Sequence, residues 1–163
     1  MNFDFNKIIK NFNVEGELVS CEPYGEGHIN LTFLLITTKS KYILQRVNSN
    51  VFKNPEGLME NISGVTGYLR DIIIKNGGDP LRETLTLIPA VDGKTFYKDE
   101  EGNYFRIYVF IDNAQTYQVV EKKEDFYNAA SAFGKFQNML ADYPAKELFE
   151  TIVDFHHTPK RFE

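Results

Sequence analysis

The sequence of 163 residues predicts an α+β fold, with an antiparallel sheet of about five strands, one long packed helix, and further helices towards the C-terminus. Two observations lead to this prediction. Segments in which apolar and polar residues alternate come first, and short glycine-containing turns join them. After residue 120 the apolar period changes from two residues to about 3.6, the period of a helix. Hairpin links of this kind join antiparallel strands, whereas a parallel sheet needs long crossover connections.

The first elements are a short helix and three strands. Apolar residues in segment 3–13 recur at spacings of three and four, which predicts a short amphipathic helix at the edge of the domain. Residues 18–23, 31–37 and 42–47 are predicted strands with β-branched and aromatic residues. The turn between the first two contains Gly25 and Gly27. Glycine suits such a turn because it accepts positive φ without steric cost.

A long helix is expected from residue 54 to residue 76. Asn54 can cap its N-terminus, Pro55 suits its first turn, and the glycine pair at 77–78 ends it. Three internal glycines weaken it by up to about 1 kcal/mol each relative to alanine, so tertiary packing must stabilise this helix. Its predicted apolar stripe consists of Leu58, Ile62, Val65, Leu69, Ile72 and Ile73.

The second half of the chain continues the sheet and then turns helical. Residues 85–89 and 95–98 are two further predicted strands around a turn at 92–93, and residues 104–111 form the strongest predicted strand. An apolar stripe from Phe126 to Leu140 predicts a helix, and a second short helix is expected over residues 148–155.

Composition excludes several classes of function. With 25% charged and 42% hydrophobic residues, the chain has a soluble globular composition, and its length fits one domain. The net charge of −5 disfavours nucleic acid and anionic membranes as partners, since both need clustered Lys and Arg. Neither a signal peptide nor an apolar run of about 18 residues is found, so a cytoplasmic location is expected. The single cysteine, Cys21, excludes an internal disulfide and a Cys-rich metal site.

The glycine turn is the main candidate for chemistry. A Gly-x-Gly turn between antiparallel strands is neither a dinucleotide-binding fingerprint, which opens a helix, nor a P-loop, which needs Gly-Lys-Ser/Thr. A glycine-rich hairpin followed by a strand with a cationic side chain is typical of protein-kinase-type enzymes. On these residues alone, an ordinary tight hairpin stays open as the other interpretation.

The order of these elements resembles the nucleotide-binding lobe of the aminoglycoside phosphotransferase and choline kinase superfamily. Four segments are similar, more closely, to the N-acetylhexosamine 1-kinase branch. They are Gly-Glu-Gly-His-Ile-Asn at 25–30, Tyr-Ile-Leu-Gln-Arg-Val-Asn at 42–48, Val-Phe-x-x-Pro-x-x-Leu-Met-x-Asn-Ile-x-x-Val-Thr at 51–66, and Phe-His-x-Thr-Pro-x-Arg-Phe at 155–162. The resemblance covers nearly the whole chain, but only the first half of the family.

The resemblance implies a protein-kinase-like N-terminal lobe at residues 1–120 and a helical hinge, the start of a second lobe, at 121–163. Such enzymes transfer the γ-phosphate of ATP, with magnesium, to the anomeric hydroxyl of N-acetylglucosamine or N-acetylgalactosamine. The sequence contains no His-x-Asp-x-x-x-x-Asn catalytic loop. We therefore expect no catalytic residue and no metal ligand in this chain, the magnesium ligands in the missing lobe, and no turnover by the chain alone.

The resemblance also implies a set of nucleotide-binding residues. Backbone amides of the glycine turn would lie over the ATP phosphates, and Arg46 would contact the α- and β-phosphates. Leu44 and Tyr108 would border the adenine, next to hinge backbone at 109–112. The full set is Gly25, Glu26, Gly27, His28, Ile29, Asn30, Leu44, Arg46, Asn61, Tyr108, Phe110, Ile111 and Asp112.

Several of these assignments have alternatives. The long helix should orient Arg46 through Asn61, or else through Glu60, which the helical periodicity places on the solvent side. Gln45 in the position of the cation would weaken the assignment. His28 and Asn30 fit simple turn formation equally well, and Leu44 and Tyr108 fit a plain core equally well.

Partners follow from the same resemblance. We expect ATP for this chain, an N-acetylhexosamine for the full-length protein, and self-association of the isolated lobe, as a homodimer, through apolar surface that a second lobe would bury. The alternative is a non-catalytic nucleotide-binding or interaction module.

Overall fold

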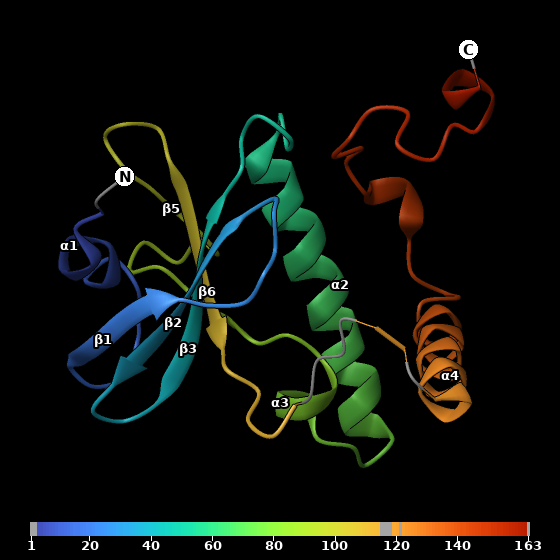
Figure 1. The fold of residues 1–163 in the computed structure, drawn as a ribbon, viewed down its shortest axis with the longest axis horizontal. Helices are drawn as coiled ribbons and strands as arrows, with labels where there is room; N and C mark the ends of the chain where they lie inside the picture. Colours follow the sequence, from blue (N-terminus) through green and yellow to red (C-terminus); the bar gives the residue numbers. More distant parts are fainter. Residues whose placement is uncertain (1–2, 115–118, 121, 163) are drawn as a thin grey trace.

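The computed structural model describes residues 3–114, 119–120 and 122–162. An antiparallel sheet lies between a short N-terminal helix and one long helix, and the C-terminal third lies beyond the long helix (Figure 1). The elements are α1 (Phe5–Ile9), β1 (Leu18–Pro23), β2 (Leu31–Thr37), β3 (Lys41–Val47), α2 (Pro55–Lys75), α3 (Pro80–Glu83), β4 (Leu87–Ile88), β5 (Tyr97–Lys98), β6 (Tyr104–Val109) and α4 (Lys123–Met139), with single 3₁₀ turns at Ala145–Glu147 and Pro159–Arg161.

The sheet confirms the predicted fold class. Its strands follow the order β1-β2-β3-β6-β4, every pair is antiparallel, and β5 also pairs with β6. The strands expected at 85–89 and 95–98 are only two residues long each. Both pair with the same strand, β4 opposite Ile107 and Tyr108 and β5 opposite Tyr104 and Phe105, so they divide one edge of β6 between them.

The main core lies between the sheet and α1. Leu35, Leu44, Phe105 and Ile107 are fully buried there, together with the first helix. That helix is shorter than predicted, and its position at the edge of the domain was predicted wrongly, because Ile8 and Ile9 are only 5% and 6% exposed. With α2 on one face only, the sheet needs apolar cover on the other face, and segment 3–12 supplies it.

Helix α2 begins as predicted. The side chain of Asn54 accepts a hydrogen bond from the backbone N–H of Gly57 at 2.9 Å, and Pro55 is in the first turn. The predicted stripe is only partly right, since Leu69 and Ile73 are buried whereas Leu58, Ile62 and Val65 are half-buried. Met59, outside the predicted stripe, is fully buried against the sheet. Ile62 and Val65 instead line an apolar groove of about 460 Å³ with Phe136 and Leu148.

Two of the α2 glycines allow the C-terminal segment to approach the helix closely. A Cβ on Gly57 would lie 2.8 Å from the ring of Phe149, and one on Gly64 would lie 2.6 Å from the hydroxyl of Tyr143. Asn61 lies between them and binds the backbone of Phe149 in both directions, accepting from its N–H at 2.9 Å and donating to its C=O at 2.8 Å. The packing that must offset these glycines is therefore contact with residues 143–149.

The C-terminal third differs from the prediction in one element. Helix α4 is present, but the helix expected over residues 148–155 was predicted wrongly, and bends and turns stand there instead. Both backbone groups of Phe149 bond to the Asn61 side chain and are not available to a helix. Of the described helices, none is both long and apolar enough to cross a membrane. The predicted domain boundary lies beside residue 121, outside the described residues, and stays a prediction.

Candidate functional site

The glycine turn projects from the sheet between β1 and β2. Gly25 has a φ of +75°, which confirms the expected need for glycine, whereas Gly27 is not in the positive-φ region. A Cβ on either residue would meet no heavy atom within 4 Å. Glu26, His28 and Ile29 are exposed. The turn therefore leaves open space above its backbone, as close approach of a ligand requires.

One end of the turn is fastened by a reciprocal pair of asparagines. The Asn30 side chain accepts a hydrogen bond from the backbone N–H of Asn48 at 3.0 Å, and Asn48 Nδ2 donates to the C=O of Ile29 at 3.0 Å. Asn30 thus shapes the turn through the segment after β3, rather than through its own neighbours. Asn48 was not among the predicted site residues, although it ends the segment 42–48 that carried the resemblance.

The sheet face towards α2 carries a polar row next to the turn. Thr32 lies opposite Gln45, and Gln45 lies opposite Arg106, so the three residues occupy neighbouring strands at one level. Gln45 Nε2 donates to Thr32 Oγ1 at 2.9 Å, and Gln45 Oε1 accepts from Arg106 Nε and Nη2 at 3.0 and 2.8 Å. The backbone N–H of Tyr24 bonds to the C=O of Thr32, which places the row directly beside the turn.

Arg106 is the cation that the sequence reasoning missed. It is half-buried, and burial lowers the pKa of its guanidinium, an effect that neighbouring Tyr108 opposes. Its remaining contact is Nη1 to the sulfur of Met59 at 3.8 Å, and no carboxylate of the described residues forms an ion pair with it. Strand alternation could have found it, because Phe105 and Ile107 face the core and Arg106 must then face α2.

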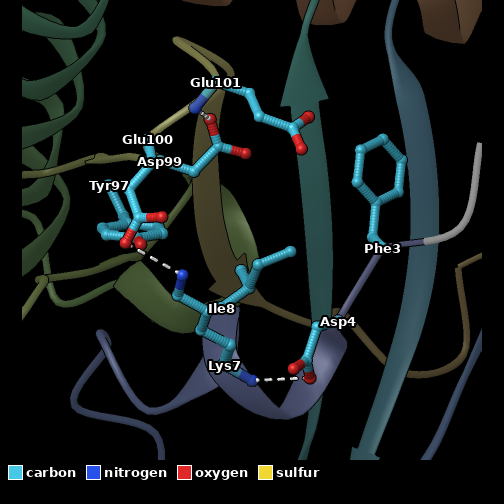
Figure 2. Close-up of a pocket in the computed structure, with 8 residues that line it drawn as sticks. All are labelled: Phe3, Asp4, Lys7, Ile8, Tyr97, Asp99, Glu100 and Glu101. Atoms are coloured by element: carbon cyan, nitrogen blue, oxygen red, sulfur yellow. Dashed lines mark hydrogen bonds and ion pairs between the residues drawn. The ribbon is translucent and has the colours of Figure 1, made fainter.

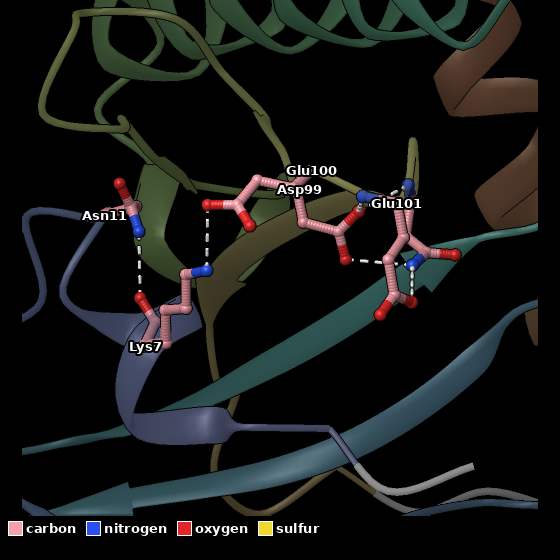
Figure 3. A network of polar contacts seen from close by, with 6 residues as sticks. Lys7, Asn11, Asp99, Glu100 and Glu101 are labelled. Atoms are coloured by element: carbon pink, nitrogen blue, oxygen red, sulfur yellow. Dashed lines mark hydrogen bonds and ion pairs between the residues drawn. The ribbon is translucent and has the colours of Figure 1, made fainter.

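Arg46 lies on the other face of the sheet. It shares that face with Tyr42 and Leu44, as expected, but this is the α1 face, where Leu44 is fully buried in the core. Arg46 Nε donates to Asn103 at 2.9 Å, and its guanidinium lies 6.0 Å from the ring centroid of Phe3. Asn103 in turn donates to Asp99, in the turn that holds Glu100 against Lys7 (Figure 3).

The expected pairing of Arg46 with α2 is therefore not made. Asn61 bonds to Phe149, and Glu60 is exposed beside Phe96. The carboxylate of Glu56, also on α2, accepts from the hydroxyl of Tyr104 at 3.0 Å. The physical reason is strand geometry, because residues 45 and 46 point to opposite faces and α2 covers only the face of Gln45.

The segment after β6 returns towards the turn. Phe110 donates its backbone N–H to the C=O of Lys41 at 3.1 Å, and Lys41 Nζ forms an ion pair with Asp112 at 2.8 Å. The C=O of Asp112 accepts from Arg82 at 2.7 Å. Tyr108 is half-buried on the α2 face, and burial raises the pKa of its hydroxyl. The hinge residues and the polar row thus border the same side of the sheet.

Two hollows lie near these elements. One of about 760 Å³ lies between Ile29 of the glycine turn, Phe52 and residues 149–157. The other, about 330 Å³, lies on the α1 side, where Asp4, Asp99, Glu100 and Glu101 surround Lys7 (Figure 2). Such an acidic lining opposes phosphate binding. The described residues contain no group of three His, Cys, Asp or Glu side chains placed to hold a metal ion.

Comparison with known proteins identifies the fold. No family model matches the sequence. Among solved structures, the chain is similar to a spectinomycin phosphotransferase, APH(9)-Ia, crystallised with ADP and spectinomycin, with a TM-score of 0.53 and 11% identity. The fold is that of the N-terminal lobe of an aminoglycoside phosphotransferase. The match covers 87% of this chain and 38% of the phosphotransferase, so the chain spans well under half of that protein's length.

Within this fold, the structure separates the predicted site residues into three groups. The turn residues 25–30, Tyr108 and the hinge residues 110–112 border the α2 side of the sheet. Leu44 and Arg46 lie on the α1 side. Asn61 contacts the C-terminal segment. Gln45, Arg106 and Thr32 take the central place between the turn and α2.

Proposed function

We propose that this chain is the ATP-binding lobe of a phosphotransferase. The observation that carries the proposal is the glycine turn beside a polar row that ends in a half-buried guanidinium without a carboxylate partner among the described residues. A buried charge without a counter-ion is costly, and a bound phosphate would offset that cost. The fold is shared with a phosphotransferase whose structure contains ADP, which supports a nucleotide as the ligand.

In this proposal the ATP phosphates lie under the turn, where backbone N–H groups at 25–29 can approach anionic oxygens without a side chain in the way. The adenine lies towards the hinge, with Tyr108 and Phe110 beside it and the backbone of 109–112 available for hydrogen bonds. Ile111 and Asp112 belong to that hinge, although the C=O of Asp112 is already bonded to Arg82.

The acceptor and the catalytic groups belong to the longer protein. We propose an N-acetylhexosamine as acceptor, phosphorylated at its anomeric hydroxyl, on the strength of the sequence segments at 25–30, 42–48, 51–66 and 155–162. Magnesium would neutralise charge on the phosphates, and its ligands would come from the second lobe, since no described cluster suits a metal here. The chain alone should then bind nucleotide without turnover.

Gly27→Ala tests whether the turn holds phosphate or is only a tight hairpin. Its φ is not positive and its Cβ would meet nothing, so the fold should be unaffected, whereas a bound phosphate would lose close approach. The matched control is Gly134→Ala in α4, which also has open space around it. ATP with magnesium should raise the unfolding midpoint of the wild type and the control, and raise that of Gly27→Ala much less. An equal rise in all three proteins would contradict the proposal.

A non-catalytic interaction module is the second candidate, and the exposed side of α4 favours it. Phe126, Tyr127 and Phe133 are 68%, 72% and 72% exposed on that one helix. The two candidates differ in the same titration. A midpoint that no adenine nucleotide moves, together with a stable complex formed through α4, would identify an interaction module.

A further inference from the structure

We propose that Arg106, oriented by Gln45, is the side chain that binds the nucleotide phosphates in this protein. This moves the phosphate-binding cation from β3, where the family pattern places it, to the neighbouring strand β6. The inference rests on the proposed function, since it names the residue that recognises the triphosphate at that same site.

Position is the first argument. Thr32, Gln45 and Arg106 are register partners across β2, β3 and β6, and the hydrogen bond from Tyr24 to Thr32 closes the glycine turn at the same level. Neighbouring strands are about 4.8 Å apart, so the Cα of Arg106 lies about 10 Å from that of Thr32. An extended arginine side chain that passes Gln45 covers most of this distance along the face under the turn.

Charge is the second argument. A guanidinium has five N–H donors, and the described contacts of Arg106 use one at Nε, one at Nη2 and one at Nη1. Gln45 and Met59 are both neutral, so the described surroundings hold the group in place without neutralising it. The two remaining N–H groups and the full positive charge suit the oxygens of a phosphate, which the planar guanidinium binds in a fork.

The geometry also excludes the rival residue. The guanidinium of Arg46 is on the α1 face, between Phe3 and Asn103, and the fully buried core residues Leu44 and Phe105 share that face. Side chains on opposite faces of one sheet cannot bind the same ligand. The only cation of β3 on the α2 face is Lys41, and it forms its ion pair with Asp112 at the far end of the strand.

The experiment measures the affinities of ATP with magnesium, of tripolyphosphate and of adenosine for four variants by calorimetry. Arg106→Gln removes the charge, and Gln45→Glu keeps the geometry but adds a carboxylate that neutralises Arg106. Arg46→Gln tests the rival, and Arg70→Gln is a matched control, because Arg70 is likewise half-buried and donates to a neutral partner, Thr86.

We expect Arg106→Gln and Gln45→Glu to weaken ATP and tripolyphosphate binding by about 10- to 100-fold, the usual effect of losing charge-assisted hydrogen bonds. Adenosine affinity should change less than about twofold in both, which also shows that the site is folded. Arg46→Gln and Arg70→Gln should bind all three ligands like the wild type.

Three results would overturn the inference. The first is a loss of phosphate binding in Arg46→Gln but not in Arg106→Gln. The second is Gln45→Glu with unchanged ATP affinity, which decides the matter even where Arg106→Gln fails to fold. The third is a wild type that binds none of the three ligands, and this result alone would also refute the proposed function.

Discussion

The ring of Tyr24 in the glycine turn packs against the ring of Phe110 just after β6, with centroids 5.7 Å apart and planes at 79°. The turn therefore folds back across the α2 side of the sheet and meets the predicted hinge. Lys41 adds to the contact, with its ammonium 5.7 Å from the centre of the Phe110 ring. A purine cannot lie between two rings in direct contact, so base binding between the turn and the hinge must separate them.

Replacing Tyr24 tests this closed arrangement. An edge-to-face aromatic pair is worth about 0.5–1.5 kcal/mol, and a ligand that breaks the pair loses that free energy. Tyr24→Ala should therefore raise the affinity for ATP by about two- to tenfold, measured by calorimetry. Tyr127→Ala on α4 is the control, since that side chain is 72% exposed and distant in sequence. Weaker binding by Tyr24→Ala would mean that the ring contacts the base directly.

Asn61 should hold the C-terminal segment against α2. Its side chain makes two hydrogen bonds to the backbone of Phe149, so Asn61→Ala should lower the free energy of unfolding by about 1–2 kcal/mol and expose residues 148–157 to protease. Denaturant unfolding and limited proteolysis measure the two effects. Asn138→Ala, an exposed helical asparagine of α4, is the control. Unchanged cleavage in Asn61→Ala would refute this role.

Cys21 predicts a loss of stability at high pH. Burial, helped by the charge of Glu22, raises the pKa of its thiol from 9.0 to about 12. The folded protein thus favours the protonated thiol, so its contribution to stability is complete below pH 9 and decreases as pH rises from 9 towards 12. Denaturant unfolding at pH 8 and pH 10.5 should show a larger loss for the wild type than for Cys21→Ala. Equal losses would show that the thiol is not protected.

Helix α4 predicts self-association of the chain. Phe126, Tyr127 and Phe133 expose a large apolar area on one helix, and such a patch is favourable to cover. Analytical ultracentrifugation should detect a homodimer whose population rises with concentration, and Phe126→Glu with Phe133→Glu should abolish it. Lys123→Glu with Lys135→Glu on the same helix changes charge without removing apolar area. A chain that stays monomeric at high concentration would contradict this prediction.

Features set by neighbouring residues could be predicted from the sequence. The alternation in 18–23, 31–37 and 104–109 depends on strand geometry alone, and the Asn54 cap with Pro55 depends on one helical turn. Gly25 was predictable for the same reason, since positive φ is a local property. The antiparallel α+β class follows from these elements together.

Features set by which surfaces meet could not be predicted in this way. Arg46 alternates as expected with Tyr42 and Leu44, but the sequence does not say which face α2 will cover. Met59 is buried because α2 contacts the sheet on one side and residues 143–149 on the other, so two partly overlapping apolar stripes look like one. The absent helix at 148–155 has a similar cause, since a distant side chain, Asn61, takes the backbone bonds of Phe149.

The central claim is that an adenine nucleotide binds on the α2 side of the sheet, under the glycine turn. Its most direct test is to add ADP with magnesium to the ¹⁵N-labelled chain and follow the amide and guanidinium resonances by NMR. The account predicts shifts at Gly25–Asn30, at the side chains of Gln45 and Arg106, and at Phe110–Asp112. A spectrum that does not change, or shifts confined to the groove between α2 and α4, would contradict it.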